Sequence, residues 1–412
     1  MIRKNNTKNF IWNAIGLTFN SFNSLFFLIA VRYINGVDVA GIFTYAFALC
    51  ALFYIISIYY NRSFQVSDAK DKFSFSDYLS CRILTSILSF ALIIIFALIN
   101  QFSFFEVAVI ALLMIFRIVE AISDCFYGAI HKKSHLYQTG ISLTLKAIIG
   151  LCVFSVVDFL TKNLCLSITA LVAINIIIFL FYDLKNYKNL YKEKLKINFK
   201  NIKLILKTCF PVFLFSILSL YLANCQKYIL PYFDTYDAQT IFGILIMPAT
   251  ILSLIGSYLI NPVLDILTSH HENKNFSAFI KLSKKILLLL LGVGILAITA
   301  AYFLGVPVLE LIYQLDLSDY RLALVIIVIA SIFFAVAMII SSLLTVLKEN
   351  RRQTYIYIIT AATATIISIF FIQSSGVTGA AWSFFISSII LVVLYIALLQ
   401  IKLHSLRSRY GK

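Results

Sequence analysis

Long apolar runs, separated by short polar and basic stretches, follow one another along this chain of 412 residues. A helix needs about 20 mainly apolar residues to cross the hydrocarbon core of a bilayer. On that requirement the pattern predicts about twelve spans, at 10–33, 37–60, 78–99, 104–127, 136–157, 163–183, 208–231, 239–260, 284–305, 320–347, 352–372 and 377–401. Because backbone polar groups in lipid must be satisfied within the segment, we expect these spans to be helices.

The composition agrees with a membrane protein rather than a soluble one. The chain is 61% hydrophobic and 13% charged, and its mean hydropathy is +0.95. A soluble domain is nearer half apolar and a quarter charged. The first apolar run follows Arg3, Lys4 and Lys8 and is longer than the core of a cleaved signal peptide, so we interpret it as a retained helix. The predicted fold class is an all-α polytopic membrane protein.

Basic residues mark one side of the predicted membrane. The connections on one side, together with both termini, hold most of the 34 Lys and Arg residues. The opposite connections hold only Arg32, Lys162, Lys227 and Arg321. Since Lys and Arg stay on the cytoplasmic side, both termini are predicted to be cytoplasmic. The net charge of +16 then faces an anionic leaflet, and we expect no nucleic-acid partner.

The longest internal connection divides the predicted spans into two equal sets. It predicts an N-terminal six-helix half at 1–183, a basic cytoplasmic loop at 184–207, and a C-terminal half with a basic tail at 208–412. Halves with an even number of spans are parallel in topology, as in several secondary transporters. We therefore expect two six-helix halves around a central cavity.

Four ionisable side chains are placed in the membrane core: Arg117, Glu120 and Asp124 in the fourth span, and Lys146 in the fifth. Each costs about 2.5–3.5 kcal/mol on insertion scales, and the first three share one helix face. In a functional interpretation Arg117 and Lys146 bind phosphate oxygens, while Glu120 or Asp124 takes up H⁺ or helps to bind Na⁺. In a structural interpretation, Arg117–Glu120 and Lys146–Asp124 ion pairs lock two helices together.

Polar side chains in the first helix of each half are further candidates for substrate binding. Asn20 and Asn23 make the first helix too polar to face lipid all round, and Asn224 lies near the outer end of the seventh. Arg32 and Lys227 end these two helices on the outer side, where they could line an outer mouth. The alternatives are hydrogen bonds between helices for the asparagines and snorkelling for the cations.

Two prolines fall in the predicted spans of the second half. Pro248, in the middle of the eighth helix, is expected to kink it. Pro211 is expected to lie near the start of the seventh helix, where a proline costs little.

The chain carries no signature of catalysis or of a metal centre. It lacks Walker, HExxH and G-x-S-x-G motifs, and its seven cysteines show no CxxC spacing. The longest predicted outer connection, 306–319, is too short for an external catalytic domain. We expect a protein that is not an enzyme and has no metal or cofactor.

Three segments carry a resemblance to a known family. They are "NGVDVAGIFTYAFA" (35–48), "YNRSFQVSD" (60–68) and "GVTGAAWSFFIS" (376–387). With the twelve-helix pattern, they resemble the Wzx-type flippases of O-antigen and capsule repeat units, in the polysaccharide-transporter branch of the multidrug/oligosaccharidyl-lipid/polysaccharide superfamily. The resemblance implies a protein of the bacterial cytoplasmic membrane that moves undecaprenyl-diphosphate-linked oligosaccharide outward by alternating access. It also implies polysaccharide polymerase and glycosyltransferase partners.

Two other functions stay open. An ion-coupled multidrug antiporter of the same superfamily usually takes cationic substrates, so basic residues near the midplane argue against it. A membrane-embedded polysaccharide polymerase would need a sizeable outer loop, which the predicted connections do not provide.

Overall fold

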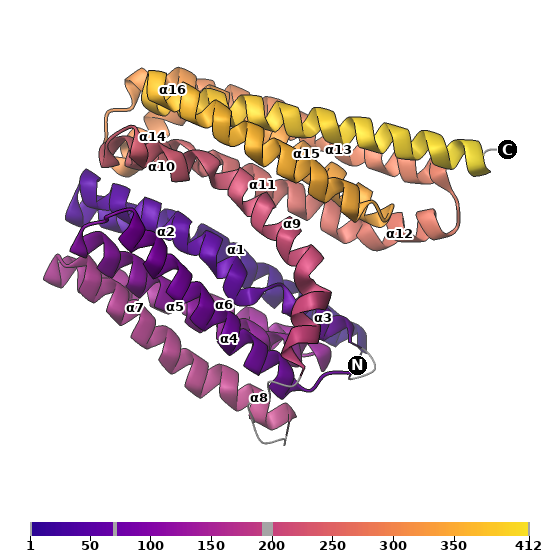
Figure 1. The fold of residues 1–412 in the computed structure, drawn as a ribbon, viewed down its shortest axis with the longest axis horizontal. Helices are drawn as coiled ribbons and strands as arrows, with labels where there is room; N and C mark the ends of the chain where they lie inside the picture. The colour runs from indigo at the N-terminus through magenta and orange to yellow at the C-terminus, as the bar shows by residue number, and fades with distance from the viewer. Residues whose placement is uncertain (1, 69–71, 192–200, 411–412) are drawn as a thin grey trace. The chain divides into compact units, whose positions relative to one another are not determined.

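The computed structural model describes residues 2–68, 72–191 and 201–410 (Figure 1), and every regular element in these residues is helical. The all-α prediction is confirmed. The chain divides into two compact units, Met1–Ile217 and Leu218–Lys412, called here the N-terminal and C-terminal units. The division lies inside a helix, and the predicted halves 1–183 and 208–412 stay a prediction.

The N-terminal unit is a bundle of long helices with two short ones. Its elements are α1 (Ile2–Asn35), α2 (Val37–Ile58), α3 (Asn61–Ser67), α4 (Phe75–Ile99), α5 (Phe104–Lys132), α6 (Leu136–Thr161), α7 (Leu164–Ile178), the π-helical turn η1 (Phe179–Asp183), α8 (Leu184–Leu190) and the first part of α9 (Ile202–Ile229).

The C-terminal unit holds the rest of α9 and several interrupted helices. They are η2 (Leu230–Tyr232), α10 (Tyr236–Leu245), α11 (Met247–Ile260), η3 (Asn261–Val263), α12 (Leu264–Glu272), α13 (Phe276–Ala300), η4 (Ala301–Gly305), α14 (Val306–Tyr313), η5 (Ser318–Tyr320), α15 (Arg321–Val346) and α16 (Asn350–Tyr410).

The helices account for the predicted spans. Within the described residues, ten helical stretches are long and apolar enough to cross a membrane. The 29-residue α5 is a further long helix, which carries the charges predicted for the fourth span. α16 is interrupted at Ser375 and at Gly376, where φ is 51°, so it contains the last two predicted spans. The chain is therefore a multi-pass membrane protein.

Several helices continue past their predicted ends, which corrects three expectations. The predicted loop 184–207 is helical at α8 and from Ile202 onward, while its residues 192–200 lie outside the described part. Pro211 lies inside α9, not near its start. The predicted outer connection 306–319 is helical through Tyr313. Hydropathy detects the apolar middle of a helix, whereas hydrogen bonding continues into the polar interface.

The predicted kink at Pro248 is present as a break. α10 ends at Leu245 and α11 begins at Met247, with Pro248 in its first turn. Proline has no N–H to continue the helical ladder, and its ring clashes with the preceding turn.

In the N-terminal unit, α1 lies against α6 backbone to backbone. A Cβ atom at Gly140 would clash with the backbone of Trp12, and one at Gly16 would clash with Gly140. At one end of the contact the Asn9 amide donates to the Ser134 carbonyl (2.9 Å). At the other end the Asn35 amide donates to Asp158 Oδ2 (2.6 Å). These contacts fix the rotation of α1 about its axis and hence the direction of its asparagines.

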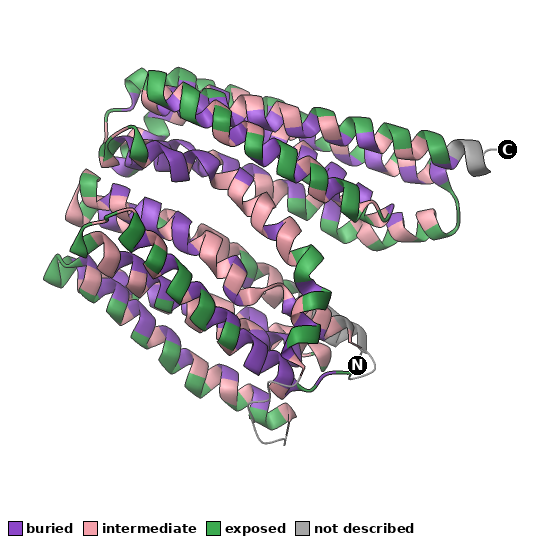
Figure 2. Cartoon of the chain, viewed as in Figure 1, coloured by how far each residue is buried: buried purple, intermediate pink, exposed green. Residues whose placement is uncertain are grey.

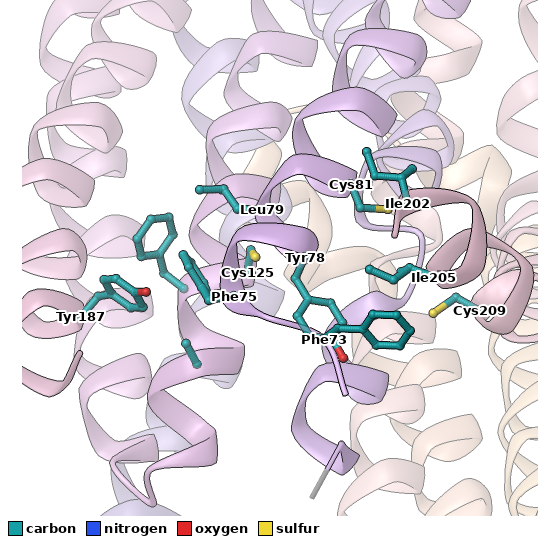
Figure 3. Packing of buried hydrophobic residues seen from close by; sticks show 12 residues of the cluster. Phe73, Phe75, Tyr78, Leu79, Cys81, Cys125, Tyr187, Ile202, Ile205 and Cys209 are labelled. Atoms are coloured by element: carbon teal, nitrogen blue, oxygen red, sulfur yellow. The ribbon is translucent and has the colours of Figure 1, made fainter. Parts of the chain in front are cut away.

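Buried aromatic residues hold α8 and the start of α9 against α4 and α5. The cluster comprises Phe73, Phe75, Tyr78, Leu79, Cys81, Cys125, Phe126, Ala129, Tyr187, Ile202, Ile205 and Cys209 (Figure 3). Phe179 of η1 packs against Phe126 with ring centroids 5.1 Å apart. The packing fixes the π turn and hence Asp183 at its end. Outside this core, helices such as α4 and α7 alternate buried and exposed faces (Figure 2), as expected of helices with one side toward lipid.

Candidate functional site

The charged residues of α5 line one side of the interior of the N-terminal unit. Arg117, Glu120, Ser123, Asp124 and Tyr127 follow one another at spacings of one or three residues. Each makes a polar contact with another side chain of the unit. They fall into three groups, described in turn.

The first group forms a polar pocket of about 220 Å³ between α1, α2 and α5. Its lining residues are Asn20, Ser21, Asn23, Ser24, Phe27, Phe47, Phe116, Arg117 and Glu120. Arg117 Nη1 lies 2.6 Å from Glu120 Oε2, so the predicted pair is confirmed. The guanidinium also lies 4.4 Å from the centroid of the Phe47 ring, a cation–π contact that orients it. The pocket thus brings together four of the predicted site residues.

The second group surrounds Lys146 on α6. Its Nζ donates to Asp183 Oδ2 (2.6 Å), Ser123 Oγ (2.7 Å) and the Tyr127 hydroxyl (3.0 Å). The side chains of Lys146 and Asp183 are only 8% and 1% exposed. The predicted Lys146–Asp124 pair is therefore wrong. The helix that begins at Leu164 continues through η1, so Asp183 stays inside the bundle and reaches Lys146 first. Lys146 does not line the pocket that holds Arg117.

The third group places Asp124 between two arginines. Arg62 Nη1 of α3 lies 2.8 Å from Asp124 Oδ1, and Arg82 Nη2 of α4 lies 3.0 Å from Oδ2. Arg82 is fully buried and also donates to Asn61 Oδ1 (2.6 Å). Two bridges to one carboxylate satisfy both of its oxygens.

A glycine on α5 leaves room for a side chain of α3. A Cβ atom at Gly128 would clash with the Gln65 side chain of α3. The Gln65 amide in turn donates to the Cys125 carbonyl of α5 (3.3 Å). The predicted spans leave Arg62 in a connection and Arg82 in the first turn of 78–99, so neither was predicted as a partner of Asp124, and α3 was not predicted. The sequence feature that could have revealed α3 is the polar segment "YNRSFQVSD" (60–68), which follows α2.

Together the three groups carry a net positive charge. Their cations outnumber their carboxylates by one, the members being Arg62, Arg82, Arg117 and Lys146 against Glu120, Asp124 and Asp183. From the sequence the buried cluster was expected to be neutral, because Asp183, Arg62 and Arg82 were not counted. This excess, in the groups beside the pocket, suits an anionic ligand better than a cationic one.

The other predicted residues lie outside this pocket. Arg32 is half-buried in the last turn of α1. In the C-terminal unit, the Asn224 amide donates to the Leu220 carbonyl of its own helix (3.2 Å). The Lys227 carbonyl accepts from the Gln239 amide (3.3 Å), which ties the end of α9 to α10. The C-terminal unit also has an apolar pocket of about 440 Å³ between α13, α15 and α16, whose lining offers little to a polar ligand.

Comparison with known proteins supports the fold. No protein-family model matches the chain. It is 21% identical over 322 residues to the capsular polysaccharide biosynthesis protein CapF of Staphylococcus aureus. The aligned residues make up 78% of this chain and 80% of CapF.

Solved structures of transporters resemble it more completely. The lipid II flippase MurJ in an inward closed conformation matches with a TM-score of 0.72 and 15% identity, over 96% of this chain and 90% of that one. An inward-facing multidrug-resistance MATE transporter of the MOP superfamily matches with a TM-score of 0.71 and 10% identity, over 97% of this chain and 100% of that one. The chain therefore has the helical fold of the MurJ flippase and of the MATE transporters of the MOP superfamily.

Proposed function

We propose that this protein is a flippase for lipid-linked oligosaccharides. It moves undecaprenyl-diphosphate-linked repeat units from the cytoplasmic to the outer leaflet of the bacterial cytoplasmic membrane, by alternating access, for O-antigen or capsule synthesis. The observation that carries the proposal is the polar pocket in which Arg117 and two asparagines meet inside a membrane bundle, beside charged groups whose cations outnumber their carboxylates by one. The similarity to CapF and to the MurJ fold supports it.

The pocket has the chemistry of a diphosphate site. A guanidinium binds phosphate oxygens through two parallel hydrogen bonds. Arg117 Nη1 is engaged by Glu120, whereas its Nε is buried and has no hydrogen-bond partner among the described residues. The amides of Asn20 and Asn23 add donors that suit phosphate or sugar oxygens.

The size of the pocket limits what it holds. Its volume is about 220 Å³. Sites for drug-sized ligands are larger, with volumes of about 300–1,000 Å³. In this proposal it binds the charged linkage, while the glycan and the isoprenoid tail extend beyond it.

Glu120 is the proposed coupling residue of the pocket. Its carboxylate competes with the diphosphate for Arg117, since the two anions use the same donors. Protonation of Glu120, or displacement by the substrate, releases Arg117 for binding. Asp124 is less suited to coupling, because each of its two oxygens is bridged to an arginine.

The remaining candidates have supporting roles in this proposal. Lys146 contributes positive charge from behind Ser123 and Tyr127 rather than a direct contact. Arg32, Lys227 and Asn224 stay candidates for the outer mouth. A polysaccharide polymerase and glycosyltransferases are the proposed partners in the pathway, with no cofactor.

Complementation of glycan export tests the proposal. We expect Arg117→Ala to reduce export at least about tenfold, and Arg117→Lys to restore it only in part, since Lys cannot bind two oxygens in parallel. Arg352→Ala is the matched control, because Arg352 is exposed and pairs loosely with Glu349 (3.6 Å). Full export by well-expressed Arg117→Ala would contradict the site assignment.

The location of the accumulated intermediate separates the candidate functions. A deletion strain should accumulate lipid-linked repeats on the inner face of the membrane. Accumulation of single repeats on the outer face would instead indicate a polymerase. Salt-dependent efflux of a cationic dye from vesicles, without glycan export, would indicate an antiporter.

A further inference from the structure

The environment of the Lys146 ammonium consists of oxygen atoms. Three oxygens lie within 3.0 Å of Nζ: Asp183 Oδ2 at 2.6 Å, Ser123 Oγ at 2.7 Å and the Tyr127 hydroxyl at 3.0 Å. They come from two elements, η1 and α5, and the Tyr127 and Phe179 rings lie 5.3 and 5.9 Å from Nζ. A buried carboxylate with neutral oxygens around it is the ligand type that hard cations take.

These oxygens are held by groups other than the lysine. The Tyr127 hydroxyl and Ser142 Oγ share a hydrogen bond of 2.8 Å, and Ser123 Oγ also donates to the Val119 carbonyl (2.9 Å). The aromatic packing of Phe179 on Phe126 fixes the turn that carries Asp183. The oxygen cage therefore has a scaffold that does not depend on Lys146.

One buried oxygen of the cage is unused. Asp183 is 1% exposed, yet its Oδ1 accepts no hydrogen bond from any residue that the structure describes. A carboxylate offers about four lone-pair sites, and a buried polar atom without a partner carries a cost. The ammonium therefore contacts only one of the two oxygens that the Asp183 carboxylate offers.

We propose that Asp183, Ser123 and Tyr127 form a monovalent-cation site whose ion is replaced by the tethered ammonium of Lys146. The occupant never leaves, so the wild-type protein needs no exchangeable Na⁺ or K⁺ at this position. The consequence for transport rests on the proposed flippase function. The cation site itself does not, and can be tested on the purified protein.

Removal of the tether should uncover the site. In purified Lys146→Ala, we expect thermal unfolding in about 150 mM NaCl or KCl to occur about 3 °C or more above that in choline chloride of the same ionic strength. The wild type should show no such difference. Two variants serve as matched controls: Lys146→Met fills the space of the lysine, and Lys146→Ala with Asp183→Asn removes the carboxylate. Neither should respond to Na⁺ or K⁺.

Each outcome decides the proposal. An equal midpoint for Lys146→Ala in all three salts would overturn it, as would a cation response that persists with Asp183→Asn. Failure of Lys146→Ala to fold in Na⁺ and in K⁺ also counts against it, since a bound ion should neutralise the carboxylate. If the wild type itself responds to Na⁺ or K⁺ and Asp183→Asn abolishes that response, the site takes a free ion. This result would overturn the proposal that Lys146 replaces the ion.

Export measurements separate this inference from the proposed function. Wild-type glycan export should be unchanged when choline replaces Na⁺, whereas export by Lys146→Ala should fall about tenfold without Na⁺ or K⁺. If neither the wild type nor Lys146→Ala exports glycan in any salt, while Lys146→Ala keeps its thermal response to Na⁺ or K⁺, only the flippase function is refuted. Export without the thermal response would defeat only the cation site.

Discussion

Replacement of Asp124 by asparagine separates a structural role from a coupling role. The Asp124 carboxylate bridges Arg62 and Arg82, at 2.8 and 3.0 Å. An amide of the same shape can accept one of these hydrogen bonds but carries no charge. Arg82, which is fully buried, would then keep Asn61 as a neutral partner but lose its anionic one. We therefore expect Asp124→Asn to destabilise the N-terminal unit.

The size of the effect follows from burial. Removal of one partner from a buried ion pair costs about 3–5 kcal/mol, because the other charge stays buried and uncompensated. Asp124 and Arg62 are 18% and 27% exposed, so solvent screens part of the loss, and we expect about 2–3 kcal/mol. Glu120→Gln is the matched control. Its one ion-pair partner lies on the same helix beside a pocket, and its loss should cost about 1 kcal/mol or less.

Thermal unfolding of the detergent-purified variants measures the difference. Asp124→Asn should lower the midpoint by roughly 4–8 °C, and Glu120→Gln by roughly 2 °C or less. An unchanged midpoint for Asp124→Asn, together with normal glycan export, would refute the reasoning. That result would mean that neither the fold nor transport needs the charge of Asp124. An unchanged midpoint with loss of export would instead be the result expected of a residue that takes up a proton during transport.

Two further predictions concern packing and pH. Gly140→Ala should destabilise by about 1–3 kcal/mol in thermal unfolding, because its Cβ would clash with the Trp12 backbone. Gly292→Ala, whose Cβ meets nothing within 4 Å, should be neutral or stabilising by up to about 1 kcal/mol, and equal effects would contradict the close contact. Burial alone would raise the pKa of Asp68, but two backbone N–H groups and the Tyr78 hydroxyl hold it below its ordinary value of 3.8. The stability that Asp68 adds is therefore present above that pH and lost as the pH falls through the lowered pKa, so Asp68→Asn should be less stable than wild type at neutral pH but not in strong acid. A difference that stays constant with pH would argue against these hydrogen bonds.

Local interactions were accessible from the sequence. Arg117 and Glu120 are three residues apart on one helix, so their pairing follows from helix geometry alone. The spans were accessible too, because the cost of exposing the backbone to lipid leaves few alternatives to a helix. The asparagines of α1 could be assigned to an interior face, since a lipid-facing helix would not tolerate them.

Contacts between helices were not accessible in the same way. Lys146 pairs with Asp183 rather than Asp124 because of which helices are neighbours and how far α7 continues through the π turn. Hydropathy placed Asp183 at the end of a span, and it placed Arg82 beside a connection although the structure buries it fully. Each error came from treating the end of an apolar run as the end of the bundle.

The close contact between α1 and α6 also bears on how the protein enters the membrane. α1 has the lowest mean hydropathy of the ten apolar stretches, 1.6, and it is the first to leave the ribosome. The Asn35 amide meets its partner only at Asp158, which lies 123 residues further along the chain. Until α6 has been synthesised, the polar face of α1 has no backbone groove to lie against. The polar side chains of the first helix therefore lack this partner until α6, the fifth predicted span, has been made.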